Sequence, residues 1–195
     1  VLLLAEHASV PVINALTDKL HPCQILADVQ ALREHCGNDF GSLKLTFVGD
    51  GNNVFNSWAE FAARLPLNVA LVCPPGYEPD AEILAQARKE AKGQITITHD
   101  LEVGLKDADA VYTDVWASMG QEDEAAEREK HFAPYQVNGR VMALAKPGAV
   151  FMHCLPAHRG SEVTDEVIDA PNSIVFDQAE NRLHAQKAVL VTLMR

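Results

Sequence analysis

The chain has 195 residues, and its 48% hydrophobic content is enough for a buried core, which excludes a disordered protein. Its 27 acidic and 16 basic residues give a formal net charge of −11, which argues against nucleic acid as a partner because phosphate binding needs a basic face. No apolar run approaches the length of a membrane span, and the opening segment lacks the basic region of a signal peptide, so we expect no membrane association.

The cysteines indicate the redox environment. The sequence holds four of them, scattered and without a C-x-x-C pair: Cys23, Cys36, Cys73 and Cys154. Free thiols are typical of a reducing compartment. We therefore expect a cytoplasmic protein, with an organelle as the alternative if a transit peptide lies upstream.

The first forty residues differ in pattern from the rest. Residues 10–16, "VPVINAL", resemble a strand. Residues 21–37, "HPCQILADVQALREHCG", predict a helix with a proline in its first turn and an apolar stripe. "GNDFGS", residues 37–42, then predicts a linker. We therefore predict that residues 1–36 are the end of a preceding domain.

The next part of the chain alternates strand and helix patterns. Six short apolar runs predict buried strands, at residues 44–50, 68–74, 94–100, 110–116, 149–155 and 173–178. Amphipathic helical segments separate them. This rhythm predicts an α/β fold, with a parallel sheet covered by helices on both faces, in a Rossmann-like domain over residues 37–178.

The last helix is predicted over residues 179–195. After Leu183 its residues are apolar nearly all round, so we expect that face to be buried. We predict that it packs back on residues 1–36.

Ligands of parallel sheets bind at the carboxyl ends of the strands. Just before a predicted helix, His21 and Gln24 can donate hydrogen bonds to a carbonyl or phosphate oxygen, although a lone histidine there is more often a cap. Arg182, which we expect to open the last helix, can pair with phosphate or with a neighbouring carboxylate.

The turn "GDGNN" follows the first predicted strand of the sheet. It has two glycines of a G-x-G-x-x-G fingerprint, but Val54 replaces the third, and the next strand has no acidic residue at its tip. A dinucleotide site is therefore disfavoured. The turn suits a carboxylate at the start of a helix, with an asparagine N-cap as the alternative.

Asp114 ends another predicted strand, where a buried carboxylate needs a cation or hydrogen bonds. The loop after it carries Ser118 and Gly120, and an acid beside a hydroxyl fits an ammonium ligand. The alternative is that Asp114 caps the next helix.

The segment "HCLPAH" leaves three alternatives open. A zinc site with His153, Cys154 and His158 is disfavoured because no second ligand cluster is found. A nucleophilic Cys154 would need a base, and His153 would point to the opposite face of a strand. The third alternative is a thiol beside a bound substrate, with the Leu155 carbonyl facing the same pocket.

Taken in order, "HPCQ", "GDGNN", "DVWASMG", "HCLP" and "AENR" resemble the ornithine carbamoyltransferases of the aspartate/ornithine carbamoyltransferase family. The resemblance implies transfer of the carbamoyl group of carbamoyl phosphate to the δ-amine of L-ornithine, which gives L-citrulline and phosphate in arginine biosynthesis. It also implies two α/β domains, trimers or multiples of trimers, and no metal or organic cofactor. On this basis, residues 1–36 are the remnant of a carbamoyl-phosphate domain.

The resemblance also implies residue roles. His21 and Gln24 match binders of the carbamoyl group. The ornithine contacts match Asn53, Asp114, Ser118 and Met119. Positions near the carbamoyl group and the ornithine side chain match Cys154, Leu155 and Arg182. We expect Asp114, Cys154, His21 and Arg182 to carry the catalysis.

One family motif, S-x-R-T-R, does not occur in the chain. We expect it to precede residue 1 in a longer protein, and we expect poor solubility for these 195 residues alone. A non-catalytic paralogue is the alternative. Acetylornithine and putrescine also remain alternative substrates, and a dehydrogenase is a third class. Aspartate is disfavoured because Asp114 would repel it.

Overall fold

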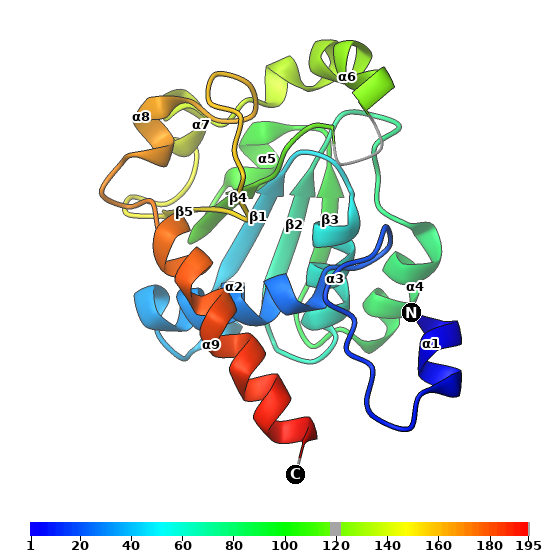
Figure 1. The fold of residues 1–195 in the computed structure, drawn as a ribbon. Coiled ribbons are helices and arrows are strands. Elements are labelled where there is room, and N and C mark those ends of the chain that lie inside the picture. Colours follow the sequence, from blue (N-terminus) through cyan, green and yellow to red (C-terminus); the bar gives the residue numbers. More distant parts are fainter. Residues whose placement is uncertain (118–121, 195) are drawn as a thin grey trace.

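The computed structural model describes residues 1–117 and 122–194. Its centre is a five-stranded parallel sheet in the order β3-β2-β1-β4-β5 (Figure 1). The strands are β1 (Lys44–Val48), β2 (Asn68–Val72), β3 (Ile95–Thr98), β4 (Ala110–Thr113) and β5 (Val150–His153). The α-helices are α1 (Leu2–His7), α2 (Pro22–Cys36), α3 (Asn53–Ala62), α4 (Ala81–Glu90), α5 (Leu101–Leu105), α6 (Ala125–Phe132), α7 (Gly139–Met142), α8 (Asp165–Ile168) and α9 (Val175–Leu193).

Alternate residues of β1, β2, β4 and β5 face two separate apolar clusters, and β3 contributes only to the first. Phe47 and Tyr112 belong to the cluster that contains buried residues of α2, α3 and α4. Val111 and Phe151 belong to the other cluster, with residues of α5, α7 and α8. A strand buried on both faces needs a continuous apolar run, which is the pattern of the sequence. The predicted parallel sheet with helices on both faces is therefore confirmed.

The sixth predicted strand, residues 173–178, is wrong. Ser173 makes a single bridge with Phe151, and α9 then begins at Val175. Val175, Gln178 and Asn181 are buried, whereas Phe176 is 68% exposed. Burial at every third residue is the pattern of a helix face. The prediction assumed the continuous apolar pattern of a buried strand, whereas the run follows the period of a helix.

Residues 10–16 form no strand either. The segment that leads to α2 runs along α3, whose side chains take up its polar backbone groups. Asn53 Nδ2 donates to the Thr17 carbonyl at 2.8 Å, and Asn56 Nδ2 donates to the Lys19 carbonyl at 3.2 Å. Within residues 10–16, the Ala15 carbonyl accepts from the His21 ring at 2.9 Å and the Asn14 carbonyl accepts from Cys23 Sγ at 3.6 Å, so side chains and not a neighbouring strand meet these groups.

Helix α9 lies against α2 through its first half (Figure 1). The part of α9 after Leu183 does not have the buried face that we expected, because Leu190, Val191 and Leu193 are 45%, 55% and 44% exposed. All residues of α1 are also exposed or half-buried. The predicted division into residues 1–36, 37–178 and 179–195 stays a prediction.

Helix α6 is rich in charged residues, but Arg128 and Phe132 on it are buried. Within the described ranges, no helix combines the length and the apolar composition that crossing a bilayer requires.

Candidate active site

The candidate site lies where β1, β4 and β5 end. Asp114 directly follows β4 and is 8% exposed. Its Oδ2 accepts a hydrogen bond from Asn52 Nδ2 at 2.7 Å, and its Oδ1 accepts from the Val115 backbone N–H at 2.8 Å. These bonds compensate for the burial of the carboxylate and fix its direction. Within the described residues, Asp114 caps no helix.

The turn after β1 holds Asp114 from the other side. Asn52 is the N-cap of α3, because its Oδ1 accepts from the N–H groups of Val54 and Phe55 at 3.0 and 3.2 Å. Its amide nitrogen remains for Asp114. Asn53, the residue singled out from the sequence, instead ties the segment before α2 to α3 through Thr17. The sequence alone could not distinguish the two neighbouring amides.

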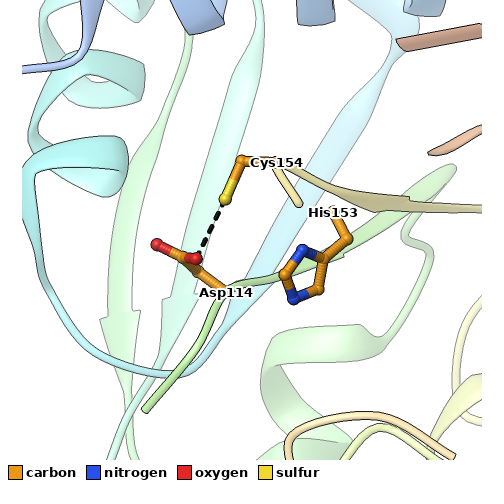
Figure 2. A group of neighbouring side chains, drawn as sticks. All are labelled: Asp114, His153 and Cys154. Carbon is orange, nitrogen blue, oxygen red and sulfur yellow. Dashed lines mark hydrogen bonds between the residues drawn. The ribbon is translucent and has the colours of Figure 1, made fainter. Parts of the chain in front are cut away.

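Cys154 follows β5, and its thiol is turned toward Asp114 (Figure 2). The Sγ atom donates to Asp114 Oδ1 at 2.9 Å. Burial, followed by the charge of Asp114 and this hydrogen bond, raises the pKa of Cys154 well above its usual value. The side chain is therefore a protonated thiol near neutral pH, which disfavours a nucleophilic role.

His153 occupies the last position of β5 and is buried. Its Nδ1 accepts a hydrogen bond from the Leu155 N–H at 2.9 Å, so in the neutral ring the proton is on Nε2, which lies 3.3 Å from Glu162 Oε1. His153, Cys154 and Asp114 could together offer ligand atoms to a metal ion (Figure 2). An ion would have to replace the hydrogen bond of the Cys154 thiol to Asp114. The third alternative, a thiol beside a bound substrate, stays a prediction.

His21 stands at the start of α2, and its backbone N–H donates to Ser57 Oγ at 2.7 Å. Its ring Nδ1 donates to the Ala15 carbonyl at 2.9 Å. The pKa of His21 is lowered, first by burial and then by the charge of Arg182. In the neutral ring, Nε2 is thus an acceptor, and donation from it requires the imidazolium form.

Gln24 and Arg182 meet between α2 and α9. The Gln24 side chain is buried, and its Oε1 accepts from Arg182 Nη1 at 2.5 Å. Arg182 was expected to open the last helix. It lies well inside α9 instead, because that helix begins at Val175. The packing of α9 on α2 is what brings the guanidinium to Gln24.

Asp28 and Gln178 are two residues to which the sequence assigned no role in the site. Both are 0% exposed, and Gln178 Nε2 donates to Asp28 Oδ1 at 2.7 Å. Asp28 lies four residues after Gln24, on the same side of the helix. The spacing of four residues between Gln24 and Asp28 could have predicted that the two side chains meet. The other partner of Asp28, on α9, lies 150 residues away in the sequence.

Leu155 is half-buried behind the site and packs with the second apolar cluster. Its φ is +56°, in the left-handed region that leucine rarely adopts, so the chain turns sharply after Cys154.

Ser118 and Met119 lie outside the described residues. The other predicted site residues fall into two groups, His21 with Gln24 and Arg182, and Asp114 with Cys154. Asn53 lies next to the second group.

Two family models match the chain. "Aspartate/ornithine carbamoyltransferase, Asp/Orn binding domain" matches residues 41–193, and "Aspartate/ornithine carbamoyltransferase, carbamoyl-P binding domain" matches residues 1–34. The chain belongs to the aspartate/ornithine carbamoyltransferase family.

Several individual carbamoyltransferases are similar to the chain. The ornithine carbamoyltransferase of Chlorobaculum tepidum is 59% identical over 191 residues, which are 98% of this chain and 56% of that protein. That of Thermococcus kodakarensis is 57% identical over 194 residues, 98% of this chain and 61% of that protein. The solved structure of ornithine carbamoyltransferase from Pyrococcus furiosus superposes with a TM-score of 0.93 at 55% identity, covering 98% of this chain and 62% of that one.

The chain therefore spans less than two thirds of the length of these carbamoyltransferases. The agreement in fold extends over 98% of this chain.

Proposed function

We propose that the protein to which this chain belongs transfers the carbamoyl group of carbamoyl phosphate to the δ-amine of L-ornithine, giving L-citrulline and phosphate. The observation that carries the proposal is the buried Asp114 carboxylate, held by Asn52 at 2.7 Å and by Cys154 at 2.9 Å. A fixed anion at this position favours an amine substrate and disfavours a dicarboxylate. The similarity to proteins named ornithine carbamoyltransferase supports the same choice.

Asp114 and Cys154 are proposed to bind the ornithine side of the reaction. The carboxylate of Asp114 accepts hydrogen bonds from an ammonium group of the substrate, and the protonated thiol of Cys154 keeps the carboxylate oriented. Asn53, Leu155 and the loop residues Ser118 and Met119 complete this side in the proposal.

Arg182, Gln24 and His21 are proposed to bind the carbamoyl side. Arg182 donates to the carbonyl oxygen, where negative charge develops during attack. The Gln24 carbonyl oxygen, which accepts from Arg182 in the structure, accepts from the carbamoyl NH₂ group. The neutral His21 ring, whose Nδ1 already donates to the Ala15 carbonyl, offers Nε2 as a second acceptor to the carbamoyl NH₂ group.

The proposed chemical step needs a neutral δ-amine. Its nitrogen forms a bond to the carbamoyl carbon, and the carbonyl oxygen becomes an oxyanion beside Arg182. When the oxyanion collapses, the bond from carbon to the phosphate oxygen breaks. The nitrogen loses one proton, which leaves with phosphate. No metal or organic cofactor enters this scheme.

The finer expectations belong to the same proposal. Residues 1–36 are proposed to be the end of the carbamoyl-phosphate domain, and residues 37–178 are proposed to be the ornithine domain. The helix over residues 179–195 is proposed to return to the first domain. We also propose a trimer or a multiple of trimers, a place in arginine biosynthesis and a cytoplasmic location.

The test is product formation by the full natural polypeptide, with carbamoyl phosphate and, in parallel, ornithine, acetylornithine, putrescine or aspartate. The proposal expects citrulline from ornithine and no product from aspartate. Asp114→Asn should lower kcat/KM for ornithine by about a hundredfold or more, because the anion is lost without a change of shape. Asp100→Asn is the matched control, since Asp100 is an exposed N-cap of α5 that asparagine can replace.

Each contrary result has its own meaning. Carbamoylation of aspartate would overturn the assignment of Asp114 as the selective group. Product from acetylornithine or putrescine alone would keep the reaction and move the substrate. A folded polypeptide that gives no product with any amine would support the non-catalytic alternative.

A further inference from the structure

A fully buried carboxylate lies behind the carbamoyl side of the site. Asp28 Oδ1 accepts hydrogen bonds from Gln24 Nε2 and from Gln178 Nε2, each at 2.7 Å. Gln24 comes from α2 and Gln178 from α9, so a single oxygen joins the two helices. Neither the motifs nor the proposed chemistry accounts for this residue.

These two bonds orient both amides. Because Gln24 Nε2 points to Asp28, Gln24 Oε1 points the other way and accepts from Arg182 Nη1 at 2.5 Å. Because Gln178 Nε2 points to Asp28, its Oε1 accepts from the His153 backbone N–H at 3.0 Å. If the Gln24 amide turned over, its NH₂ group would face the donors of Arg182 and its oxygen would face Asp28, so both contacts would be lost.

We propose that Asp28 is a positioning residue for carbamoyl transfer, which holds the Gln24 amide so that its carbonyl oxygen faces Arg182 and the carbamoyl NH₂ group. The inference rests on the proposed function for its substrate, but the hydrogen-bond network that carries it lies in the structure. Through Gln178 the same oxygen also supports the end of β5, one residue before Cys154.

The acceptor atom of Asp28, rather than its charge, orients the Gln24 amide. A neutral carboxyl group offers Oδ1 to two donors in the same way, and so does the oxygen of an asparagine. Asparagine and leucine both have the branched shape of aspartate, but only asparagine keeps the acceptor. In Asp28→Asn, the new amide N–H can donate a hydrogen bond to the Tyr112 hydroxyl. This hydroxyl already interacts with Asp28 and accepts from Gln178 Nε2 at 3.1 Å. Asp28→Leu and Asp28→Asn therefore form a matched pair.

The first measurement is the kinetics of citrulline formation by the full natural polypeptide. Asp28→Leu should lower kcat/KM for carbamoyl phosphate about 10- to 100-fold, as a misoriented binding group does, and should change the KM for ornithine much less. Asp28→Asn should stay within a few-fold of the natural protein. Equal losses in the two variants, both folded, would overturn the proposal in favour of a role for the charge.

A double-mutant cycle tests whether Asp28 acts through Gln24. In a Gln24→Ala background, Asp28→Leu should cause little further loss, because the amide that it orients is already absent. Full additivity of the two losses would overturn the proposal, since a merely structural role of Asp28 would act independently of the Gln24 amide.

A third readout does not depend on activity. In protein with ¹⁵N-labelled glutamine side chains, the NH₂ protons of Gln24 should exchange slowly in the natural protein and in Asp28→Asn, and faster in Asp28→Leu. Equally slow exchange in all three would overturn the proposal. If neither the natural protein nor any variant makes citrulline, the proposed function fails. The exchange measurement still shows whether Asp28 orients the Gln24 amide. Should Asp28→Leu not fold, Asp28→Ala at low temperature provides the same comparison.

Discussion

The thiol of Cys154 donates a hydrogen bond to the carboxylate of Asp114 over 2.9 Å, which links the ends of β5 and β4 (Figure 2). The two strands are neighbours in register, with Thr113 opposite His153. The pair therefore follows from parallel pairing, because the residue after each strand emerges at the same edge of the sheet.

The protonated state of this thiol can be checked directly. Iodoacetamide should label Cys154 slowly at neutral pH, because burial and Asp114 keep its pKa well above the usual value. Asp114→Asn should speed the labelling at mildly alkaline pH, since it removes the negative charge beside the sulfur. Mass spectrometry of the labelled peptide measures both rates. Rapid labelling of the natural protein at pH 7 would contradict this account of the site.

Asn52 should matter for stability as well as for the site. Asn52→Ala removes the N-cap of α3 and one hydrogen bond to Asp114. We expect the free energy of unfolding to fall by about 1 to 2 kcal/mol, and the KM for ornithine to rise. Asn53→Ala is the neighbouring comparison: it should loosen the segment at Thr17 without uncapping α3. Urea unfolding at constant pH measures both variants. Equal losses in the free energy of unfolding would show that the N-cap contributes no more than the contact at Thr17.

We expect substitution of Arg128 to destabilise the folded state more than substitution of an exposed arginine. Its side chain is 7% exposed, pairs with Asp50, donates to the Trp116 carbonyl at 2.6 Å and lies over the Tyr77 ring. Arg128→Met leaves the half-buried Asp50 carboxylate without its partner, so the free energy of unfolding should fall by about 3 kcal/mol.

Two further variants test this reason. Asp50→Asn combined with Arg128→Met should recover part of the loss, because the unpaired charge is gone. Arg159→Met removes an arginine whose partners Asp165 and Asp169 are exposed, and it should cost much less. A double variant that is as unstable as the single one would show that packing, and not the ion pair, sets the cost.

Asp28 should make stability depend on pH. Burial raises its pKa from 3.8 to about 7, against the opposing effects of Gln24, Gln178, Tyr112 and Arg182. Between these two values the unfolded chain has lost the proton that the folded chain keeps. The contribution of Asp28 to the stability of the folded state therefore decreases as the pH rises from about 4 to about 7 and is constant above that range.

Asp28→Asn lacks this titration, so it isolates the effect. The difference in the free energy of unfolding between Asp28→Asn and the natural protein should grow by roughly 4 kcal/mol across that range. Urea unfolding of both proteins at several pH values measures it. Parallel stability curves would mean that Asp28 has the same pKa in the folded and unfolded states. Cys154, which also faces Asp28, stays protonated throughout this range.

The exposed apolar ends of the described structure should promote association. Leu3 on α1 is 70% exposed and Val191 on α9 is 55% exposed, each beside further exposed apolar residues. A polypeptide of these 195 residues should therefore form aggregates in size-exclusion chromatography with light scattering. Leu3→Glu with Val191→Glu should shift it toward monomers. Val103→Glu, at an exposed valine on α5, should have little effect, and a monodisperse natural sequence would contradict the expectation.

Much of the fold could be predicted from the residues in order. Five of the six predicted runs form the strands of the parallel sheet, because strands buried on both faces need continuous β-branched and aromatic residues. The sequence also predicted that polar turns follow three of these strands. The turns "GDGNN", "DVWASMG" and "HCLP" lie at the carboxyl ends of β1, β4 and β5. The run at residues 173–178 failed, because a short apolar stretch fits a strand and a buried helix start equally well.

Tertiary packing decided the remaining details of the site. Only the turn geometry selects Asn52 over Asn53 as the amide that holds Asp114. Only the packing of α9 on α2 brings Gln178 to Asp28 across 150 residues and turns Arg182 toward Gln24. Hydrogen bonds between distant residues depend on the distance and angle that two packed helices set, and no local pattern of residues contains that information.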